Sequence, residues 1–220
     1  MLTVEEYLKL LNDSRKFPNE KKIQEEYLTK YWLKKEELND VWIEIMTGIF
    51  NSNFRNLRDR VFKEDFDFIV TAGGTLLYKE ELELLQSCMK ITEDKYFVVI
   101  EDLEVNPAEK HAPVGTEIDL PLRFRYPSNV SREEIMSGGG LSRNVYDRPI
   151  RNFRVFGDRG KWGVYSAFDY EWPLLVIGFD RNFSYLFHSK FIVPEEDAPE
   201  EYVAELEWAR KFGVKFPQMD

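Results

Sequence analysis

The chain has 220 residues, of which 43% are hydrophobic and 32% charged, a composition typical of folded proteins and not of disordered ones. Its formal net charge of −10 excludes strong binding of the chain as a whole to nucleic acid or to an anionic membrane surface. A single cysteine excludes an intramolecular disulfide and a thiolate zinc centre, and we expect no metal and no cofactor. The N-terminus lacks a secretory signal pattern and the apolar runs are too short to cross a bilayer, so we expect a cytoplasmic protein.

The first third of the chain has the pattern of helices. Thr3 and Glu6 form a capping box, in which a hydroxyl and a carboxylate each pair with a free backbone N–H. A second helix is expected from about Asn19 and a third over 38–50. The residues expected to face the core recur at three- and four-residue spacing: Ile23, Tyr27, Leu28 and Tyr31, then Leu38, Val41, Trp42, Ile45 and Met46.

The apolar pattern changes after residue 65. A strand is predicted over 66–70, a helix over 75–89 and a second strand over 96–100, which together indicate one β-α-β unit. The run 96–100 is apolar throughout, as in a strand covered on both faces. The stretch 101–120 contains two prolines and a glycine and is predicted to be a loop.

The remainder is predicted to be mainly a β-meander, with strands over 120–126, 153–156, 162–165, 174–179 and 183–187. Ser131 and Glu134 form a second capping box, which opens a short helix, and a last helix is expected from Pro199 to about Gly213. The predicted fold class is therefore α+β. A helical segment over about 1–64 precedes a mixed, mainly antiparallel sheet with packed helices over about 65–220, all in a single domain.

Two basic or glycine-rich features suggest an anion site. Gly73, Gly74 and Thr75 lie between a predicted strand and a predicted helix, where backbone N–H groups can hold a phosphate, although an ordinary turn explains them as well. The segment 123–161 carries nine Lys or Arg against four Asp or Glu. Its arginines, among them Arg143, Arg148 and Arg151, suit phosphates, but they can equally pair with the acids of the chain itself.

An aromatic cluster with flanking acids suggests a protein-binding surface. Its members, together with a nearby acidic run, are Trp162, Tyr165, Asp169, Tyr170, Glu171, Trp172, Glu195, Glu196 and Asp197. Exposed rings beside carboxylates are typical of anchors for a basic protein partner. The same rings can also be ordinary core filling of the β-rich part.

The candidates for catalysis are weaker. Asp67 with Glu93, Asp94 and Lys95 resembles the ligand pattern of a metal-dependent nuclease only loosely, because in such sites an apolar residue separates the glutamate from the lysine. Cys88 lies on an apolar helix face and is expected to be a buried, inert thiol.

Three hypotheses about function follow from these patterns. The preferred one is a non-catalytic acidic protein of the immunity or inhibitor type that blocks a basic protein partner. The second is a module that binds an anionic small molecule or nucleotide through the Gly73–Gly74 turn and the basic segment 123–161. The third is an enzyme whose carboxylate site is assembled from residues far apart in the sequence.

Overall fold

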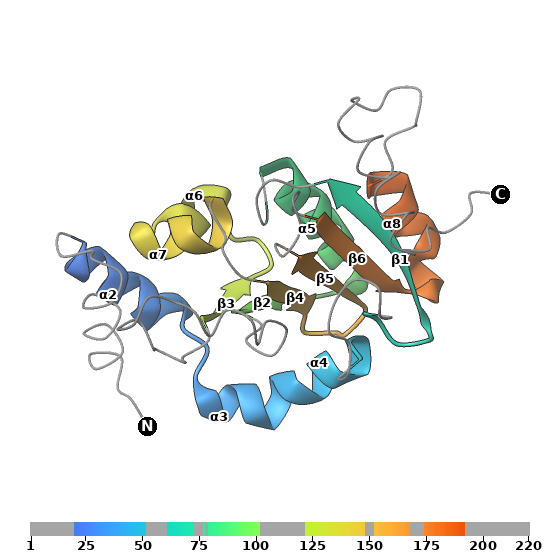
Figure 1. Ribbon diagram of the computed structural model, residues 1–220, viewed down its shortest axis with the longest axis horizontal. Coiled ribbons are helices and arrows are strands. Elements are labelled where there is room, and N and C mark those ends of the chain that lie inside the picture. Colours follow the sequence, from blue (N-terminus) through green and yellow to red (C-terminus); the bar gives the residue numbers. More distant parts are fainter. Residues whose placement is uncertain are drawn as a thin grey trace.

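Six β-strands form one antiparallel sheet at the centre of the computed structural model (Figure 1). The structure describes residues 20–51, 61–72, 77, 79–101, 122–147, 152–167 and 174–191, and all statements below concern these ranges. The order across the sheet is β1-β6-β5-β4-β2-β3, and every neighbouring pair is antiparallel. The strands are β1 Phe66–Ala72, β2 Tyr96–Glu101, β3 Arg123–Pro127, β4 Phe153–Gly157, β5 Trp162–Ala167 and β6 Leu174–Asp180.

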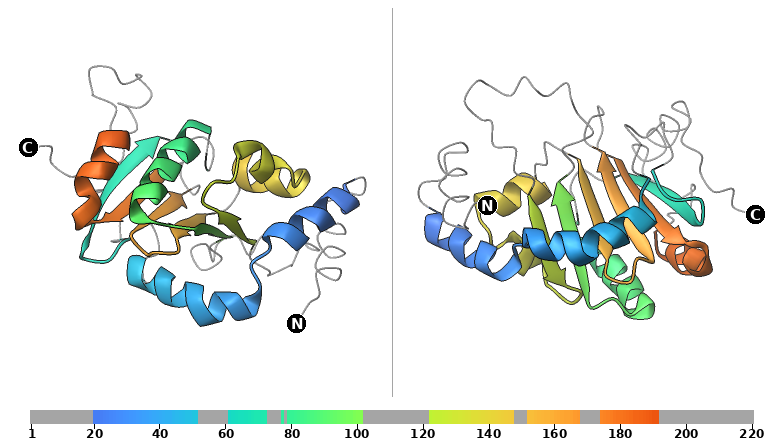
Figure 2. Two further views of the ribbon diagram at one scale, coloured as in Figure 1. Left: turned by 180° about the vertical axis from the view of Figure 1, so that it is seen from behind. Right: turned by 90° about the horizontal axis from the view of Figure 1, so that it is seen from below.

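Helices cover both faces of this sheet (Figure 2). They are α2 Lys21–Tyr31, α3 Lys35–Glu37, the π-helical turn η1 Leu38–Trp42, α4 Ile43–Ile49, α5 Lys79–Thr92, α6 Arg132–Met136, α7 Gly140–Ser142, η3 Arg143–Asp147, η4 Arg181–Phe183 and α8 Ser184–Phe191. α3, η1 and α4 follow one another without a break and pack on one face through Trp42 and Ile49. α2, α5, α6, η3 and α8 contribute to the core on the other face.

The side chains of each strand alternate between these two cores. In β2, Phe97 and Val99 belong to the core under α5, whereas Val98 and Ile100 belong to the core under α4. This alternation follows from the two-residue period of a strand. Because both faces are covered, β2 is buried from Phe97 to its end, as the unbroken apolar run predicts.

The predicted fold class, α+β with a mainly antiparallel sheet, is confirmed. The predicted capping box is also present: the Glu134 backbone N–H donates to the Ser131 hydroxyl, and the Ser131 backbone N–H donates to the Glu134 carboxylate. The meander is confirmed for β4, β5 and β6, which are consecutive neighbours. The predicted strand at 120–126 is observed as β3, but it pairs with β2 at the edge of the sheet instead of joining that meander.

The predicted β-α-β unit has a different form from the usual one. β1 and β2 run in the same direction and α5 connects them, but β6, β5 and β4 lie between the two strands. The later part of the chain therefore enters the sheet between two strands formed by the earlier part. Sequence order alone does not reveal such an insertion, since consecutive strands are neighbours in most but not all folds.

The strand predicted over 183–187 is wrong, because this segment forms the end of η4 and the first half of α8. The Asp180 side chain accepts a hydrogen bond from the Asn182 backbone N–H and so starts the helical turn. Phe187 and Phe191, four residues apart, are both buried. Short aromatic runs fit strand and helix patterns equally well, and here the helical spacing decides.

The inward stripe predicted for α2 is wrong at one position. Ile23 is 49% exposed, whereas Gln24 is 0% exposed. Tyr27, Leu28 and Tyr31 are buried as predicted. After α2, Trp32 and Leu33 extend along β3, and the Leu33 backbone N–H donates to the Arg123 carbonyl over 3.2 Å, which covers the outer edge of that strand.

Several predicted elements lie outside the described residues, namely the capping box at Thr3, the loop predicted over 101–120 except for Glu101, which ends β2, and the last helix from Pro199. The helix predicted over 75–89 is observed as α5, which begins at Lys79 and ends at Thr92. In the part of the chain that the structure describes, no helix is both long and apolar enough to cross a membrane.

Candidate functional site

Two rings that the sequence suggests as partner anchors belong to the core. Trp162 is 0% exposed and Tyr165 is 1% exposed, on opposite faces of β5. Neither ring can touch a partner in this structure, so the prediction of surface anchors is wrong for these two residues. Strand alternation alone does not reveal this, because helices bury both faces of β5.

Most of the other predicted site residues lie outside the described ranges. For the protein-binding surface these are Asp169, Tyr170, Glu171, Trp172, Glu195, Glu196 and Asp197. For the anion site they are Gly73, Gly74, Thr75, Arg148 and Arg151. Their roles stay predictions.

The described arginines of the basic segment are engaged with the chain itself. Arg143 forms an ion pair with Glu20 and Arg125 forms one with Glu37, each at 2.9 Å. Arg154 is almost buried, and its guanidinium lies over the Phe50 ring, 5.7 Å from the ring centroid. For Arg125 and Arg143, therefore, the interpretation that they pair with the protein's own acids holds.

The residues of the loose nuclease pattern do not meet. Asp67 lies near the start of β1, and Glu93, Asp94 and Lys95 precede β2. Four steps across the sheet separate these strands, which corresponds to about 19 Å at about 4.8 Å per step. Asp67 pairs with Arg181 instead, and the described ranges contain no group of three or more potential metal ligands.

Asp94 is a buried carboxylate with a structural role. Its two oxygens accept hydrogen bonds from the Trp162 indole nitrogen at 2.8 Å, the Arg159 backbone N–H at 2.8 Å and the Thr92 hydroxyl. Burial raises the pKa of Asp94, against the effect of these three donors. The contacts fasten the turn between β4 and β5 to the end of α5.

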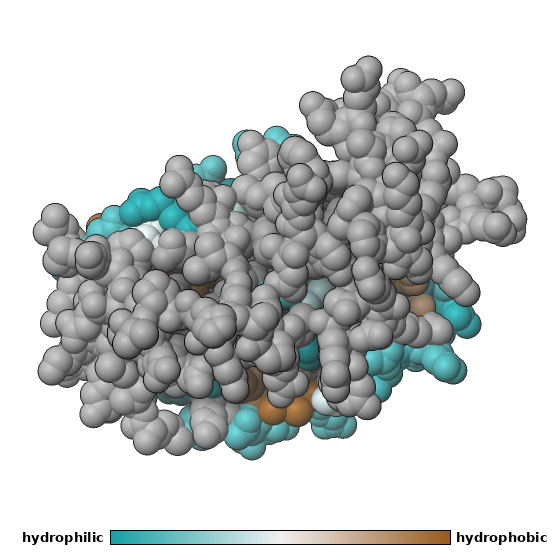
Figure 3. Space-filling model, viewed as in Figure 1, coloured by the Kyte–Doolittle hydropathy of each residue, from teal (hydrophilic) through white to brown (hydrophobic). Residues whose placement is uncertain are grey.

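The outward side of the helix from α3 to α4 combines exposed aliphatic side chains with exposed acids. We call Glu36, Asp40, Val41, Ile43 and Glu44 the outer helix face. Val41 is 51% exposed and Ile43 is 37% exposed, and all three acids are exposed. Figure 3 shows a small hydrophobic area bordered by hydrophilic atoms at the lower edge of the molecule, where Figure 1 places this helix.

The three acids of the outer helix face have no ion-pair partner among the described residues. Glu37, which lies beside them in sequence, is instead paired with Arg125. Glu36, Asp40 and Glu44 place three negative charges within nine residues of this helix. Three exposed acids and two exposed aliphatic groups therefore share this helix, and the exposed Lys34 precedes them.

A π-helical turn produces the exposure of Val41. The Ile43 backbone N–H donates to the Leu38 carbonyl five residues earlier, which widens the helix at this point. Trp42 takes the inward position and is 5% exposed, whereas Val41, expected to face the core, points outward. The prediction for Val41 is wrong because it rests on the regular 3.6-residue spacing of an α-helix, from which the π-helical turn departs. Such turns are frequent at functional sites.

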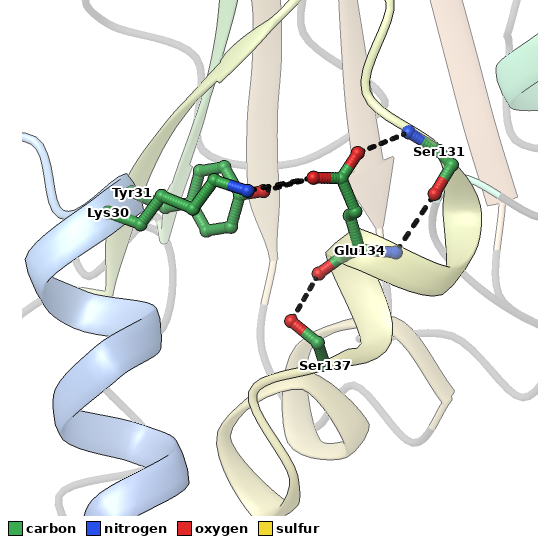
Figure 4. A network of polar contacts seen from close by, with 5 residues as sticks. All are labelled: Lys30, Tyr31, Ser131, Glu134 and Ser137. Atoms are coloured by element: carbon green, nitrogen blue, oxygen red, sulfur yellow. Dashed lines mark hydrogen bonds and ion pairs between the residues drawn. The ribbon is translucent and has the colours of Figure 1, made fainter.

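A second polar region joins α2 to α6 (Figure 4). The Glu134 carboxylate accepts hydrogen bonds from the Lys30 ammonium at 2.8 Å and from the Tyr31 hydroxyl at 3.2 Å. The Lys30 hydrogen bond is the main reason that the pKa of Glu134 lies below its ordinary value. The Ser137 hydroxyl also donates to the Glu134 carbonyl, over 2.7 Å.

Three buried phenols lie behind this region. The Tyr27 hydroxyl donates to the Ile135 carbonyl over 2.8 Å, so it accepts from the Tyr126 hydroxyl, which in turn accepts from Tyr146. Burial raises the pKa of each phenol, to about 12 for Tyr27. These phenols stay protonated at neutral pH, and they hold α2, β3, α6 and η3 together.

A comparison of the chain with models of known protein families, with curated proteins and with solved structures found no match. Within the described ranges, the outer helix face combines exposure, acids without an ion-pair partner in those ranges, and apolar groups.

Proposed function

We propose that this chain is a non-catalytic acidic protein of the immunity or inhibitor type, which blocks a basic protein partner through the outer helix face. The observation that carries the proposal is the exposure of Val41 and Ile43 among three acids that form no ion pair with a described residue. The net charge of −10 acts in the same direction.

The two kinds of side chain contribute differently to binding. Glu36, Asp40 and Glu44 attract a basic partner over a distance and raise the association rate. Val41 and Ile43 lose water on contact and so slow dissociation. The helix needs no rearrangement, because Trp42 and Ile49 already anchor its inward side in the core, and a preorganised surface binds at lower entropic cost.

The test begins with the capture of basic proteins from extracts of the native host, followed by binding kinetics at increasing salt. A triple variant, Glu36→Gln with Asp40→Asn and Glu44→Gln, is expected to slow association at low salt by about tenfold. Val41→Ala with Ile43→Ala is expected to speed dissociation with little change in association.

The matched control removes three exposed acids elsewhere, through Glu80→Gln, Glu83→Gln and Glu93→Gln. Both triple variants carry the same net charge. If both slow association equally, the outer helix face has no special role and only total charge steers the encounter. If no basic protein is captured, the proposal itself is wrong.

A further inference from the structure

The glycine turn between α6 and α7 holds a carboxylate of the chain itself. The Glu20 carboxylate accepts a hydrogen bond of 2.5 Å from the Gly140 backbone N–H and one of 2.9 Å from the Arg143 guanidinium. Gly139 has a φ of +61°, and a side chain there would collide with this carboxylate. Glycine is therefore required both for the backbone conformation and for the close approach of the anion.

The donors of this turn are those that proteins use to bind oxyanions. Gly140 begins α7, and its backbone N–H, which has no partner within the helix, donates to the carboxylate. Arg143 adds a full charge and a planar set of N–H donors. These contacts, the Gly140 N–H first and Arg143 second, lower the pKa of Glu20.

A buried amide beside the turn forms no hydrogen bond of normal length and angle with a described residue. Gln24 is 0% exposed, and it interacts only weakly with the Glu20 carboxylate, where it adds to the lowering of the pKa of Glu20. A buried polar group without a well-formed hydrogen bond is destabilising. Buried polar groups are normally paired, and an exception points to a missing partner.

The position of Gln24 on α2 directs its side chain toward the same turn. Glu20 lies one helical turn before it and contacts Gly139 and Gly140, and Tyr27 lies almost one turn after it and contacts Gly138. Residues three and four apart share one face of a helix, so Gln24 faces the turn between these two contacts.

We propose that the turn from Gly138 to Arg143 is a binding site for a small oxyanion, a carboxylate or a phosphate, and that the Glu20 carboxylate occupies it as a built-in competitor. The incoming anion takes the N–H of Gly140 and the guanidinium of Arg143 when Glu20 moves away, and the Gln24 amide donates to it. This site is separate from the outer helix face and does not depend on the protein-binding proposal.

Competition by Glu20 predicts a clear order of affinities. Calorimetric titration with inorganic phosphate and with acetate, at constant ionic strength, compares the wild-type protein with Glu20→Ala and Glu20→Gln. Both variants are expected to bind at least one of the two anions at least about tenfold more tightly than the wild-type protein, because the competing state is removed. Wild-type binding is expected to be weaker but saturable at millimolar concentrations. The anion that binds more tightly identifies the ligand chemistry.

Three further variants distinguish a preformed anion-binding site from an arginine that has merely lost its ion-pair partner. Arg143→Gln and, separately, Gln24→Leu, each in the Glu20→Ala background, are expected to reduce the affinity at least about tenfold. Glu37→Ala is the matched control, because it frees Arg125 from an ion pair of the same length but leaves neither a glycine turn nor a buried amide. It is expected to gain no binding.

Three results would overturn the proposal. The first is a folded Glu20→Ala or Glu20→Gln protein that binds neither anion at millimolar concentration, or a wild-type protein without saturable binding. The second is equal binding by Glu37→Ala, which would mean that any freed arginine collects an adventitious ion only. The third is unchanged binding after Gln24→Leu, which would mean that a buried water pairs with this amide.

Discussion

The indole nitrogen of Trp162 donates a hydrogen bond of 2.8 Å to the Asp94 carboxylate, although 68 positions separate the two residues in the chain. Trp162→Phe removes this donor and is expected to lower the free energy of unfolding by about 1–3 kcal/mol beyond the loss of ring volume. Trp42→Phe makes the same change in a buried ring without a hydrogen bond to another described residue. Urea unfolding of both variants provides the comparison, and equal losses would show that the hydrogen bond contributes nothing.

Val176 is 2% exposed in β6, an interior strand, and Leu175–Phe179 is buried throughout. Val176→Asp places a charge without a partner in the core and is expected to cost more than about 3 kcal/mol or to prevent soluble expression. Val41→Asp, on the outer helix face, is expected to stay within about 1 kcal/mol of the wild-type protein. Similar melting temperatures for the two variants would contradict the assignment of Val176 to the core or of Val41 to the surface.

Tyr126 is the middle member of the buried phenol chain. Tyr126→Phe leaves the Tyr146 hydroxyl without its acceptor and is expected to lower the free energy of unfolding by about 1–3 kcal/mol. Tyr185 is 88% exposed, so Tyr185→Phe is expected to change the free energy of unfolding by less than about 0.5 kcal/mol. Chemical denaturation measures both, and a neutral Tyr126→Phe variant would show that the chain of hydroxyls is not stabilising.

Glu134 makes the protein sensitive to acid. The pKa of its carboxyl is lowered from 4.5, mainly by the Lys30 hydrogen bond, so the folded form releases this proton more readily than the unfolded chain. The resulting stability is present above pH 4.5 and is lost as the pH falls through the lower, folded-state pKa. Glu134→Gln is expected to flatten this acid-side loss in a series of melting curves.

Lys30→Gln is the complementary variant for this carboxyl. Lys30→Gln removes the main cause of the lowered pKa of Glu134 and is expected to flatten the same acid-side loss of stability. The double variant, Lys30→Gln with Glu134→Gln, is expected to behave much like either single variant. If the effects of the two single variants on stability are fully additive in the double variant, the acid sensitivity comes from other groups.

Cys88 is expected to react slowly with thiol reagents in the native protein. It is 0% exposed, and burial raises the pKa of its thiol to about 11, so little thiolate forms near neutral pH. Titration with a chromogenic disulfide reagent is expected to show slow labelling without denaturant and fast labelling in urea. Fast labelling of the native protein would indicate an accessible thiol.

Local sequence patterns were sufficient where the physical cause is itself local. The Ser131–Glu134 capping box spans four positions, and its two reciprocal hydrogen bonds form as soon as the helix begins. The apolar run of β6 and the turn residues before β5 indicated buried strands joined as a meander. In the capping box the groups that interact lie within a few residues, and in the meander short turns join consecutive strands, so local spacing already indicates the structure.

Tertiary structure alone decided the features that could serve function. A π-helical turn rotated Val41 outward, helices on both faces buried Trp162 and Tyr165, and 120 positions separate Glu20 from the Gly140 N–H that holds it. These outcomes depend on which distant surfaces pack together, and the residue pattern of one segment does not specify which other segment packs against it. The sequence by itself therefore determined the class of fold and the local elements, whereas packing determined which acids and aliphatic groups stay exposed and which carboxylate occupies the glycine turn.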